Sequence, residues 1–487
     1  MASTLPDPHP GPHGPYRAPA APSPSDRVGH VEAHGIDHVP ERERHGRARE
    51  LFAVWAAANV NYLSLVVGGA LVLLGLSLGQ AVAVIVAGNL FWLPVGLLAV
   101  SGPASGTPSE VVTRAMYGIR ANRVNIAVNG WLICICYLAL NLAAASIAAF
   151  SLVEKAGLAT NAGVKIAVVA VIAVLTLAIS VYGHATIVKL YLPIAVVLTA
   201  AFAVVAFGVL GHTDFGHEPA DPLTGTALWA ALTAGLTLVA SGPLSYTNSA
   251  DFSRYLPRET SPKAVAGWTA LGGFLPGVLV TSLGAAAATA VDMTDPQTGL
   301  ESLLPGWFVP VFLLAVVLGA ISNNAMTAYS SGLALQAVGV RIRRSLSVIV
   351  DGVLGVVLTL YALLVSDFLG TVGNLLQLTV VLLGPTTAVY ATDILLRRGR
   401  YDGLALTDET RGSPFWFTAG VNPAGVLAFT AGIGAAALCV DTLYTGPVAH
   451  ALGGVDLSLP VGITVAALVY GALSRRTRRD SGGAPRA

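Results

Sequence analysis

The sequence is poor in charged residues: Asp, Glu, Lys and Arg make up 11% of its 487 residues, against roughly 25% in an average soluble protein. Its three cysteines cannot form a disulfide framework or a tetrahedral zinc site. A net charge of +1 gives no concentrated basic face for a nucleic-acid partner. Hydrophobic residues reach 54% and the mean hydropathy is +0.70. These values predict an integral membrane protein in the lipid bilayer.

The two ends of the chain are the polar parts of the sequence. Residues 1–49 are rich in Pro, His, Gly and charged residues and contain no apolar core, so they predict a solvated, disordered cytoplasmic tail and not a signal peptide. Six of the ten histidines lie there, but their irregular spacing argues against a metal site. Residues 475–487 begin with RRTRR and predict a basic cytoplasmic tail.

Between these tails, long apolar segments predict transmembrane helices. A spanning helix needs about 20 apolar residues. About twelve segments qualify, here numbered as spans 1 to 12: 50–76, 79–101, 122–150, 163–182, 186–211, 226–249, 264–291, 306–336, 347–366, 370–394, 417–440 and 459–474. The chain is therefore expected to be an all-α membrane protein.

The arginines indicate how these spans are oriented. If the first tail is cytoplasmic, alternate loops hold clusters such as Arg341, Arg343 and Arg344, and the chain ends in RRTRR on the same side. The opposite loops contain only Lys155 and Lys165 among basic residues. Basic residues are retained in the cytoplasm, so we expect a multi-pass protein of the plasma membrane with both termini cytoplasmic.

Two spans are interrupted by polar residues. Span 6 ends in SGPLSYTNSADFSRYLP, residues 241–257, where Pro243 removes a backbone donor. Span 1 carries Asn59 and Asn61 in an apolar run. Because these spans are five apart, we expect two inverted five-helix repeats at 50–211 and 226–394, followed by two peripheral helices at 417–474. Interrupted helices at matching positions predict a transporter's binding site at the membrane midplane.

Further polar and aromatic residues predict the lining of that site. Span 8 carries a stripe of Ser322, Asn323, Thr327 and Ser330, with Asn324 beside it. Such a stripe could also serve only helix packing. Span 3 adds Trp131, Tyr137 and Asn141, and span 10 adds Asn374 and Gln377. Few charged residues lie at the predicted midplane, which favours an uncharged, planar, hydrogen-bonding solute. Asp251 and Arg254, one helical turn apart, are expected to pair; the alternative is a proton-coupling role for Asp251.

The sequence resembles the purine–cytosine permease group of the nucleobase:cation symporter family 1. The resemblance covers about residues 50–475 and is carried by SADFSRYLP (249–257), ISNNAMTAYSSGLALQAVG (321–339), YATDILLRRGRYD (390–402), FLGTVGNLLQLTVVLLGPTTAVY and WAAANVNYL. It implies a LeuT-like fold, with ten core helices in two inverted repeats and two peripheral helices. It also implies import of a nucleobase by cation symport with alternating access, without any cofactor, enzymatic activity or obligate protein partner.

The resemblance also implies residue roles. The substrate would lie between spans 1, 3, 6, 8 and 10, close to Asn61, Trp131, the break at Ser241–Tyr246 including Gly242 and Ser245, Asn323, Asn324 and Gln377. Together with Asn59, Tyr137 and Asn141 these are the candidate substrate-binding residues. A sodium site would draw on Ala57, Val60, Gly319, Ser322 and Asn323. Asn323 replaces a second hydroxyl there, so the coupling ion is either Na⁺ or H⁺.

Alternatives remain at this stage. The same fold could carry another heterocycle, such as allantoin, hydroxymethylpyrimidine or a vitamin-like compound, because Tyr246 is the only aromatic residue in the span 6 break. A channel would require a pore that is filled with water along its whole length, which interrupted helices at one site do not provide. A membrane enzyme would need a catalytic group of residues within the bilayer, and the sequence displays none.

Overall fold

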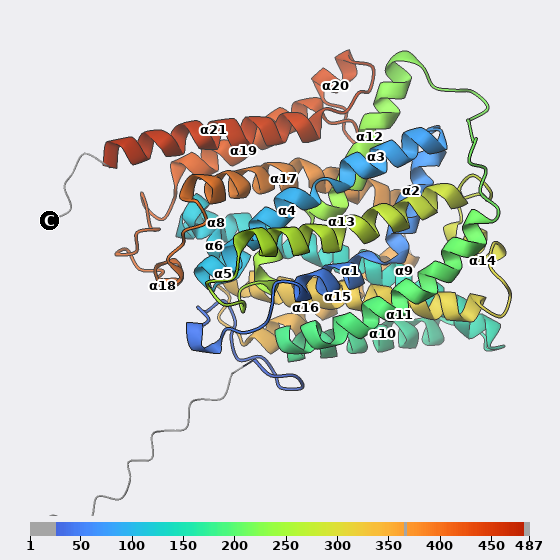
Figure 1. The fold of residues 1–487 in the computed structure, drawn as a ribbon, viewed down its shortest axis with the longest axis horizontal. Helices are drawn as coiled ribbons and strands as arrows, with labels where there is room; N and C mark the ends of the chain where they lie inside the picture. Colours follow the sequence, from blue (N-terminus) through green and yellow to red (C-terminus); the bar gives the residue numbers. More distant parts are fainter. Residues whose placement is uncertain (1–25, 365–367, 482–487) are drawn as a thin grey trace, which may run out of the picture.

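The computed structural model describes residues 26–364 and 368–481, with no side chain described over 364–374 or beyond 475. Within these ranges the chain is helical, and the only β structure is two isolated bridges, Thr418 with Val421 and Asp441 with Thr445. The helices form one elongated bundle, with α5, α6 and α18 at one end and α14 at the other (Figure 1). We call the end with α5, α6 and α18 the inner end. The all-α prediction is confirmed.

Five predicted spans make up the first half of the bundle, and several consist of more than one helix. They contain α1 (Glu50–Asn59) with α2 (Tyr62–Leu73), α3 (Leu78–Asn89) with α4 (Trp92–Ala99) and α5 (Ser101–Ser105), α8 (Ile119–Asn125) with the π-helix η2 (Ile126–Leu132) and α9 (Ile133–Lys155), α10 (Ala162–Tyr182), and α11 (His184–Leu210). Two short helices connect spans 2 and 3: α6 (Ser109–Val112) and α7 (Arg114–Tyr117).

The second half follows the same order of spans. It contains α12 (Gly225–Leu244) with the 3₁₀ helix η3 (Ser249–Phe252), α13 (Pro262–Ala287), the short α14 (Pro296–Ser302), α15 (Val309–Val338), α16 (Arg344–Leu364) and α17 (Phe368–Arg397). The rest of the chain adds α18 (Gly403–Thr407), α19 (Pro423–Cys439), α20 (Pro447–Ala451) and α21 (Ser458–Ser481).

The number of membrane crossings is close to the prediction. Within the described ranges, ten helices are long and apolar enough to cross a membrane, and the bent pair α1–α2 adds an eleventh. Helix α19 is apolar but has 17 residues, which is short for a crossing. The folded N-terminal segment and the end of α21 both lie at the inner end of the bundle (Figure 1). That placement fits an even number of crossings, and twelve stays a prediction.

Asn61 creates the break in span 1. Helices α1 and α2 meet at an angle of 57°, and Asn61 between them is extended, with φ −140° and ψ 161°. Its side-chain oxygen accepts a hydrogen bond from the Ser64 amide (3.0 Å), and its Nδ2 donates to the Ala58 carbonyl (2.7 Å). The Asn61 side-chain amide therefore pairs with backbone groups on both sides of the break. In the hydrocarbon of a membrane these groups would otherwise have no hydrogen-bond partner.

The break in span 6 lies later than predicted. Helix α12 continues through Pro243 to Leu244, and the irregular segment is Ser245–Asn248, followed by η3. Pro243 lies in the last turn of α12, so it removes a single helical hydrogen bond and the helix tolerates it. The expected break at Ser241–Tyr246 is corrected accordingly: Ser241 and Gly242 are helical.

Contacts between the spans repeat from one half of the bundle to the other. Helix α2 packs on α13 and α12 packs on α3; α1 packs on α11 and α12 on α17; α9 packs on α16 and α15 on α10. In span numbers, the contact of 1 with 7 corresponds to that of 6 with 2. In the same way, 1 with 5 corresponds to 6 with 10, and 3 with 9 corresponds to 8 with 4. Each contact has a counterpart shifted by five spans, as in a five-plus-five, LeuT-like fold.

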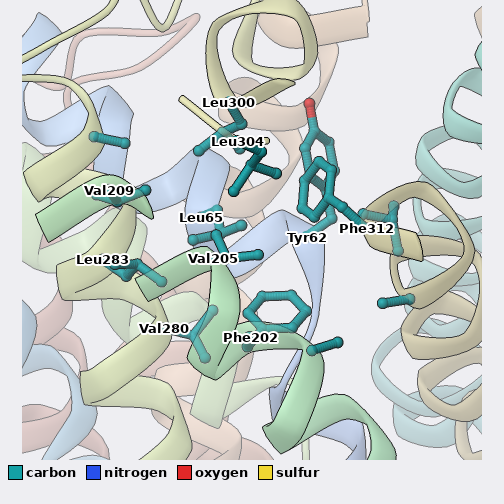
Figure 2. Close-up of a cluster of buried hydrophobic side chains, with 14 of the residues drawn as sticks. Tyr62, Leu65, Phe202, Val205, Val209, Val280, Leu283, Leu300, Leu304 and Phe312 are labelled. Atoms are coloured by element: carbon teal, nitrogen blue, oxygen red, sulfur yellow. The ribbon is translucent and has the colours of Figure 1, made fainter. Parts of the chain in front are cut away.

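An apolar cluster holds α2, α11, α13, α14 and α15 together (Figure 2). Leu65, Phe202, Val205 and Phe312 point into it, and each of these side chains is at most 5% exposed. In a bilayer the lipid tails are as apolar as these side chains, so close packing, and not removal from water, stabilises such contacts. The cluster joins span 1 to spans 5, 7 and 8.

Glycine allows the closest approach in this region, between α2 and α13. A Cβ atom added at Gly284 would overlap the Leu65 carbonyl. We therefore expect Gly284→Ala to lower the free energy of unfolding by about 1–3 kcal/mol, as overpacking does. Gly267 on the same helix has no atom within 4 Å of an added Cβ, so Gly267→Ala should be neutral or slightly stabilising. Thermal unfolding in detergent would test this, and equal melting temperatures for the two variants would contradict it.

The prediction of a disordered tail over 1–49 was wrong for residues 26–49; residues 1–25 lie outside the described part of the chain. Residues 26–49 pack on the inner end of the bundle, and Glu32 has no exposed side-chain area. Arg254 donates to Glu32 at 2.7 Å, and His184 contacts Asp26 at 2.7 Å. The polar composition suggested solvation, but Asp26 and Glu32 each meet a buried partner from a distant span.

Acidic pH should detach residues 26–49 from the helix bundle. Burial acts to raise the pKa of Glu32, but Arg344 and Arg254 outweigh it, so the folded-state pKa is below the usual 4.5. A lowered folded-state pKa adds stability above the unfolded-state value, and that stability is lost as pH falls. The hydrogen-exchange protection factors of residues 26–49 should therefore fall below about pH 4.5 while the spans stay protected. Protection factors that stay unchanged across this range would contradict the assignment.

Candidate substrate site

A cavity lies between the two interrupted helices, and we call it the central cavity. Nine of the twelve predicted substrate-binding residues line it: Asn59, Asn61, Tyr137, Asn141, Ser241, Gly242, Ser245, Tyr246 and Asn323. They come from spans 1, 3, 6 and 8, which the sequence places far apart. Among the described residues that line the cavity, none is Asp, Glu, Lys, Arg or His. These lining side chains offer hydrogen bonds and shape but no group for ion pairing.

Asn323 connects four of the elements around the cavity. Its Nδ2 donates to the Ala58 carbonyl at 2.9 Å and to the Tyr246 hydroxyl at 2.8 Å. Its Oδ1 accepts from Asn141 Nδ2 at 3.2 Å. One buried amide thus joins the break of span 1, span 3, the break of span 6 and its own helix α15. This position makes the geometry of the cavity depend on Asn323.

The aromatic wall of the cavity is Tyr246. Trp92 stacks on its ring, with centroids 5.3 Å apart and planes at 27°, and Trp55 meets it edge-on at 5.1 Å. Both tryptophans are fully buried. They hold the Tyr246 ring in a fixed orientation, which suits stacking against a flat solute. Trp92 of span 2 therefore supports the Tyr246 ring and does not itself line the cavity.

Three predicted residues do not line the central cavity. Trp131 donates from Nε1 to Asp351 Oδ1 at 2.7 Å, away from the cavity. Asn324 faces span 3, where its Nδ2 donates to the Leu138 carbonyl at 3.0 Å. Gln377 is half-buried but is not among the lining residues, and Asn374 lies outside the described side chains. Trp131, Asn324 and Gln377 are therefore not part of the lining of the central cavity.

Several polar residues of the cavity were not predicted from the sequence: Asn89, Ser64 and Thr281 line it. Asn89 carried a usable signal, because an amide within an apolar run is rare in hydrocarbon unless it has a structural or binding role. Ser64 and Thr281 carried none, since single hydroxyls are common in membrane helices.

Four of the five predicted sodium ligands come together between span 1 and span 8. Ser322 Oγ donates to the Ala57 carbonyl (3.0 Å) and to the Gly319 carbonyl (2.8 Å). A Cβ added at Gly319 would lie 3.0 Å from the Val60 carbonyl oxygen. Asn323 departs from the prediction because its oxygen faces Asn141 and its Nδ2 faces span 1. The oxygens that remain suit a hard cation, but the set is smaller than predicted.

The expected pair of Asp251 with Arg254 is not formed. Asp251 accepts from the Ser109 amide (2.8 Å) and from Ser330 Oγ (2.6 Å). Arg254 instead donates to Glu32 and Tyr329. The η3 helix ends at Phe252, and Arg254 lies in the turn that follows, so the two residues do not share one continuous helix and the one-turn spacing does not apply.

A polar cavity at the meeting point of two interrupted membrane helices defines a membrane carrier. The chain matches, over residues 38–462, the family of permeases for cytosine/purines, uracil, thiamine and allantoin, and it belongs to that family. It is therefore a multi-pass membrane transport protein and not an enzyme. A Bacillus subtilis (strain 168) protein, YxlA, described as a purine-cytosine permease, is 26% identical over 466 residues, covering 93% of this chain and 98% of YxlA.

Two solved structures share the fold. One is Mhp1, a nucleobase-cation-symport-1 family transporter, in a closed conformation with bromovinylhydantoin bound; its TM-score is 0.75 at 16% identity, covering 92% of this chain and 96% of Mhp1. The other is the inward-facing conformation of Mhp1, with a TM-score of 0.69 at 18% identity and the same coverage. The higher score belongs to the closed conformation.

Proposed function

We propose that this protein imports a nucleobase of the cytosine or purine type by symport with a cation, Na⁺ or H⁺. The observation that carries the proposal is the uncharged central cavity, in which amides and hydroxyls surround the fixed ring of Tyr246. A nucleobase is flat and neutral and presents donors and acceptors along its edges. It would stack on Tyr246 and exchange its bonds with water for bonds to the amides of spans 1 and 8.

Selectivity in such a site follows from unmatched hydrogen bonds. A buried polar group left without a partner costs about 1–3 kcal/mol. A heterocycle with the wrong edge pattern would leave one of the cavity amides unpaired and would bind more weakly, although no charge opposes it. The coupling cation acts by favouring one conformation, and only a difference in its affinity between conformations can do so.

We also propose the orientation and the moving parts. Both termini are cytoplasmic, in the plasma membrane, because the arginine-rich loops lie on the side of the tails. The repeats 50–211 and 226–394 provide a four-helix bundle that rocks against a scaffold and opens the central cavity to each side in turn. The region 417–474 is peripheral to this movement.

A second substrate class is another planar heterocycle, such as allantoin, hydroxymethylpyrimidine or a vitamin-like compound. The family description includes thiamine and allantoin besides the nucleobases. The span 6 break provides only one aromatic ring, Tyr246, whose other stacking partner is Trp92. A solute that stacks on Tyr246 therefore has its second face free to contact other side chains, which would set substrate preference.

Uptake of radiolabelled cytosine into proteoliposomes of the purified protein tests the proposal. Sodium and proton gradients are imposed separately, and unlabelled adenine, guanine, hypoxanthine, uracil and allantoin serve as competitors. Saturable uptake driven by one gradient, with competition by bases, is the expected result. If no base competes and neither gradient drives uptake, the nucleobase proposal fails, and competition by allantoin alone would select the second class.

A further inference from the structure

A second, smaller polar cavity lies beside the central cavity on the side of the inner end. It is lined by residues of α6, α8, η2, α9 and α17, including Glu110, Asn125, Asn129 and Tyr390. Cys134, Ser245 and Asn248 line both cavities. We call it the inner cavity. Its shared wall with the central cavity places Glu110 on the inner side of the substrate site.

Glu110 is buried without the partners that a carboxylate needs. Its side chain is 2% exposed, and Oε2 has no hydrogen-bond partner. Asn129 Oδ1 and Asn125 Nδ2 in the same cavity are also unpartnered, and these residues are 4% and 6% exposed. An ionised carboxylate in such a place is very costly, whereas a protonated carboxyl is not.

Asp251 is the anion beside it. Asp251 is fully buried, and its two oxygens accept from the Ser109 amide and Ser330 Oγ, bonds that favour the charged form. Asp251 accepts from the amide of Ser109, the residue next to Glu110 on α6, so the two carboxyls lie close together. Two buried carboxyls this close cannot both be ionised, and the donors around Asp251 put the proton on Glu110.

The surroundings of Glu110 keep that proton in place. Burial first, and then the charge of Asp251, raise the pKa of Glu110 well above 4.5, and Arg254 opposes them. The other titratable side chains at the inner cavity are Cys134 on α9 and Tyr390 on α17. The Arg254 guanidinium itself is held by Glu32 and the Gly35 carbonyl. Opening of the inner end to water would remove the burial that retains the proton.

We propose that Glu110, paired with Asp251, is the binding site of the coupling ion, and that this ion is a proton. The inference rests on the proposed transport function and deepens it. Glu110 takes one proton to become a neutral carboxyl, which donates to Asp251 while the inner end is closed. When that end opens, the same O–H bond breaks and the proton leaves to water, returning the carboxylate.

The variant Glu110→Gln tests this site. Its amide keeps a donor for Asp251 and imitates the protonated acid, so the protein should fold. In proteoliposomes we expect cytosine counterflow, which requires binding and exchange but no net proton movement, to continue. Accumulation driven by a proton gradient, and the substrate-dependent acidification of the lumen, should be lost. Asp351→Asn is the matched control: its carboxylate is also buried but lines neither cavity, so both activities should remain.

The outcomes separate the two proposals. If wild-type protein shows neither binding nor counterflow of any heterocycle, the transport proposal fails. If wild-type protein transports and Glu110→Gln still accumulates substrate and acidifies the lumen, the proton site is overturned, as it also is if only a sodium gradient drives uptake. Infrared spectroscopy provides a readout without transport. A protonated-carboxyl band at neutral pH should disappear in Glu110→Gln and persist in Asp351→Asn; a band unchanged in Glu110→Gln would overturn the assignment.

Discussion

Replacing Asn323 with alanine should weaken substrate binding by roughly 5- to 150-fold, the equivalent of about 1–3 kcal/mol for a buried polar group left unpaired. The change removes a hydrogen bond to the Tyr246 hydroxyl, one from Asn141, and one of the two side-chain donors to the Ala58 carbonyl. Tyr246 would lose the hydrogen bond that fixes its hydroxyl, and the Asn141 side chain would rotate into the volume that the Asn323 side chain had occupied. Binding should be measured by calorimetry or by displacement of labelled cytosine from purified protein.

The neighbouring residue offers a matched control. Asn324 has the same side chain on the same helix, but it donates to Leu138 and does not line the central cavity. Asn324→Ala should lower the melting temperature, because it removes the hydrogen bond from α15 to the Leu138 carbonyl of α9, and should leave substrate affinity close to that of the wild type. Equal losses of affinity at the two positions would show that the effect is structural and would contradict the assignment of Asn323 to the site.

Replacing Glu32 with alanine should destabilise the inner end by about 3–5 kcal/mol, the range for breaking a buried ion pair by removing one partner. One Glu32 oxygen accepts from Arg254 (2.7 Å), from Tyr255 (2.6 Å) and from Tyr329 (3.0 Å). Without it, the Arg254 guanidinium stays buried between two tyrosine hydroxyls with no countercharge from this segment. The segment 26–49 should then detach from spans 6 and 8.

Hydrogen exchange and thermal unfolding would measure this effect. Residues 26–49 should lose protection in Glu32→Ala, and the melting temperature should fall. Glu41 lies in the same segment and pairs with Arg44 at 3.0 Å, but its side chain is 48% exposed. Glu41→Ala should therefore cost no more than about 1 kcal/mol, as exposed pairs do. A comparable loss of protection in both variants would mean that Glu32 does not anchor the segment.

The central cavity and the folded segment 26–49 both depend on residues whose importance the local sequence does not reveal. Asn323 and Asn324 are identical in type and adjacent, yet about 100° apart around a helix with 3.6 residues per turn. Which of them faces the cavity depends on how α15 is rotated against spans 1 and 3. Glu32 lies in a segment whose composition is that of a disordered chain, and its partners are more than 200 positions away in Arg254 and Tyr329.

The sequence by itself determined the membrane class, the approximate spans, the two interrupted helices and the family. These properties are local, because hydropathy over about 20 residues decides whether a segment crosses the bilayer, and an amide or a proline acts on its own turn. Only the tertiary structure decided that Trp92 and not Trp131 supports the aromatic wall, that Arg254 pairs with Glu32 and not with Asp251, and that Glu110 meets Asp251. Those outcomes depend on helix rotation and on contacts between distant segments, which no short stretch of sequence encodes.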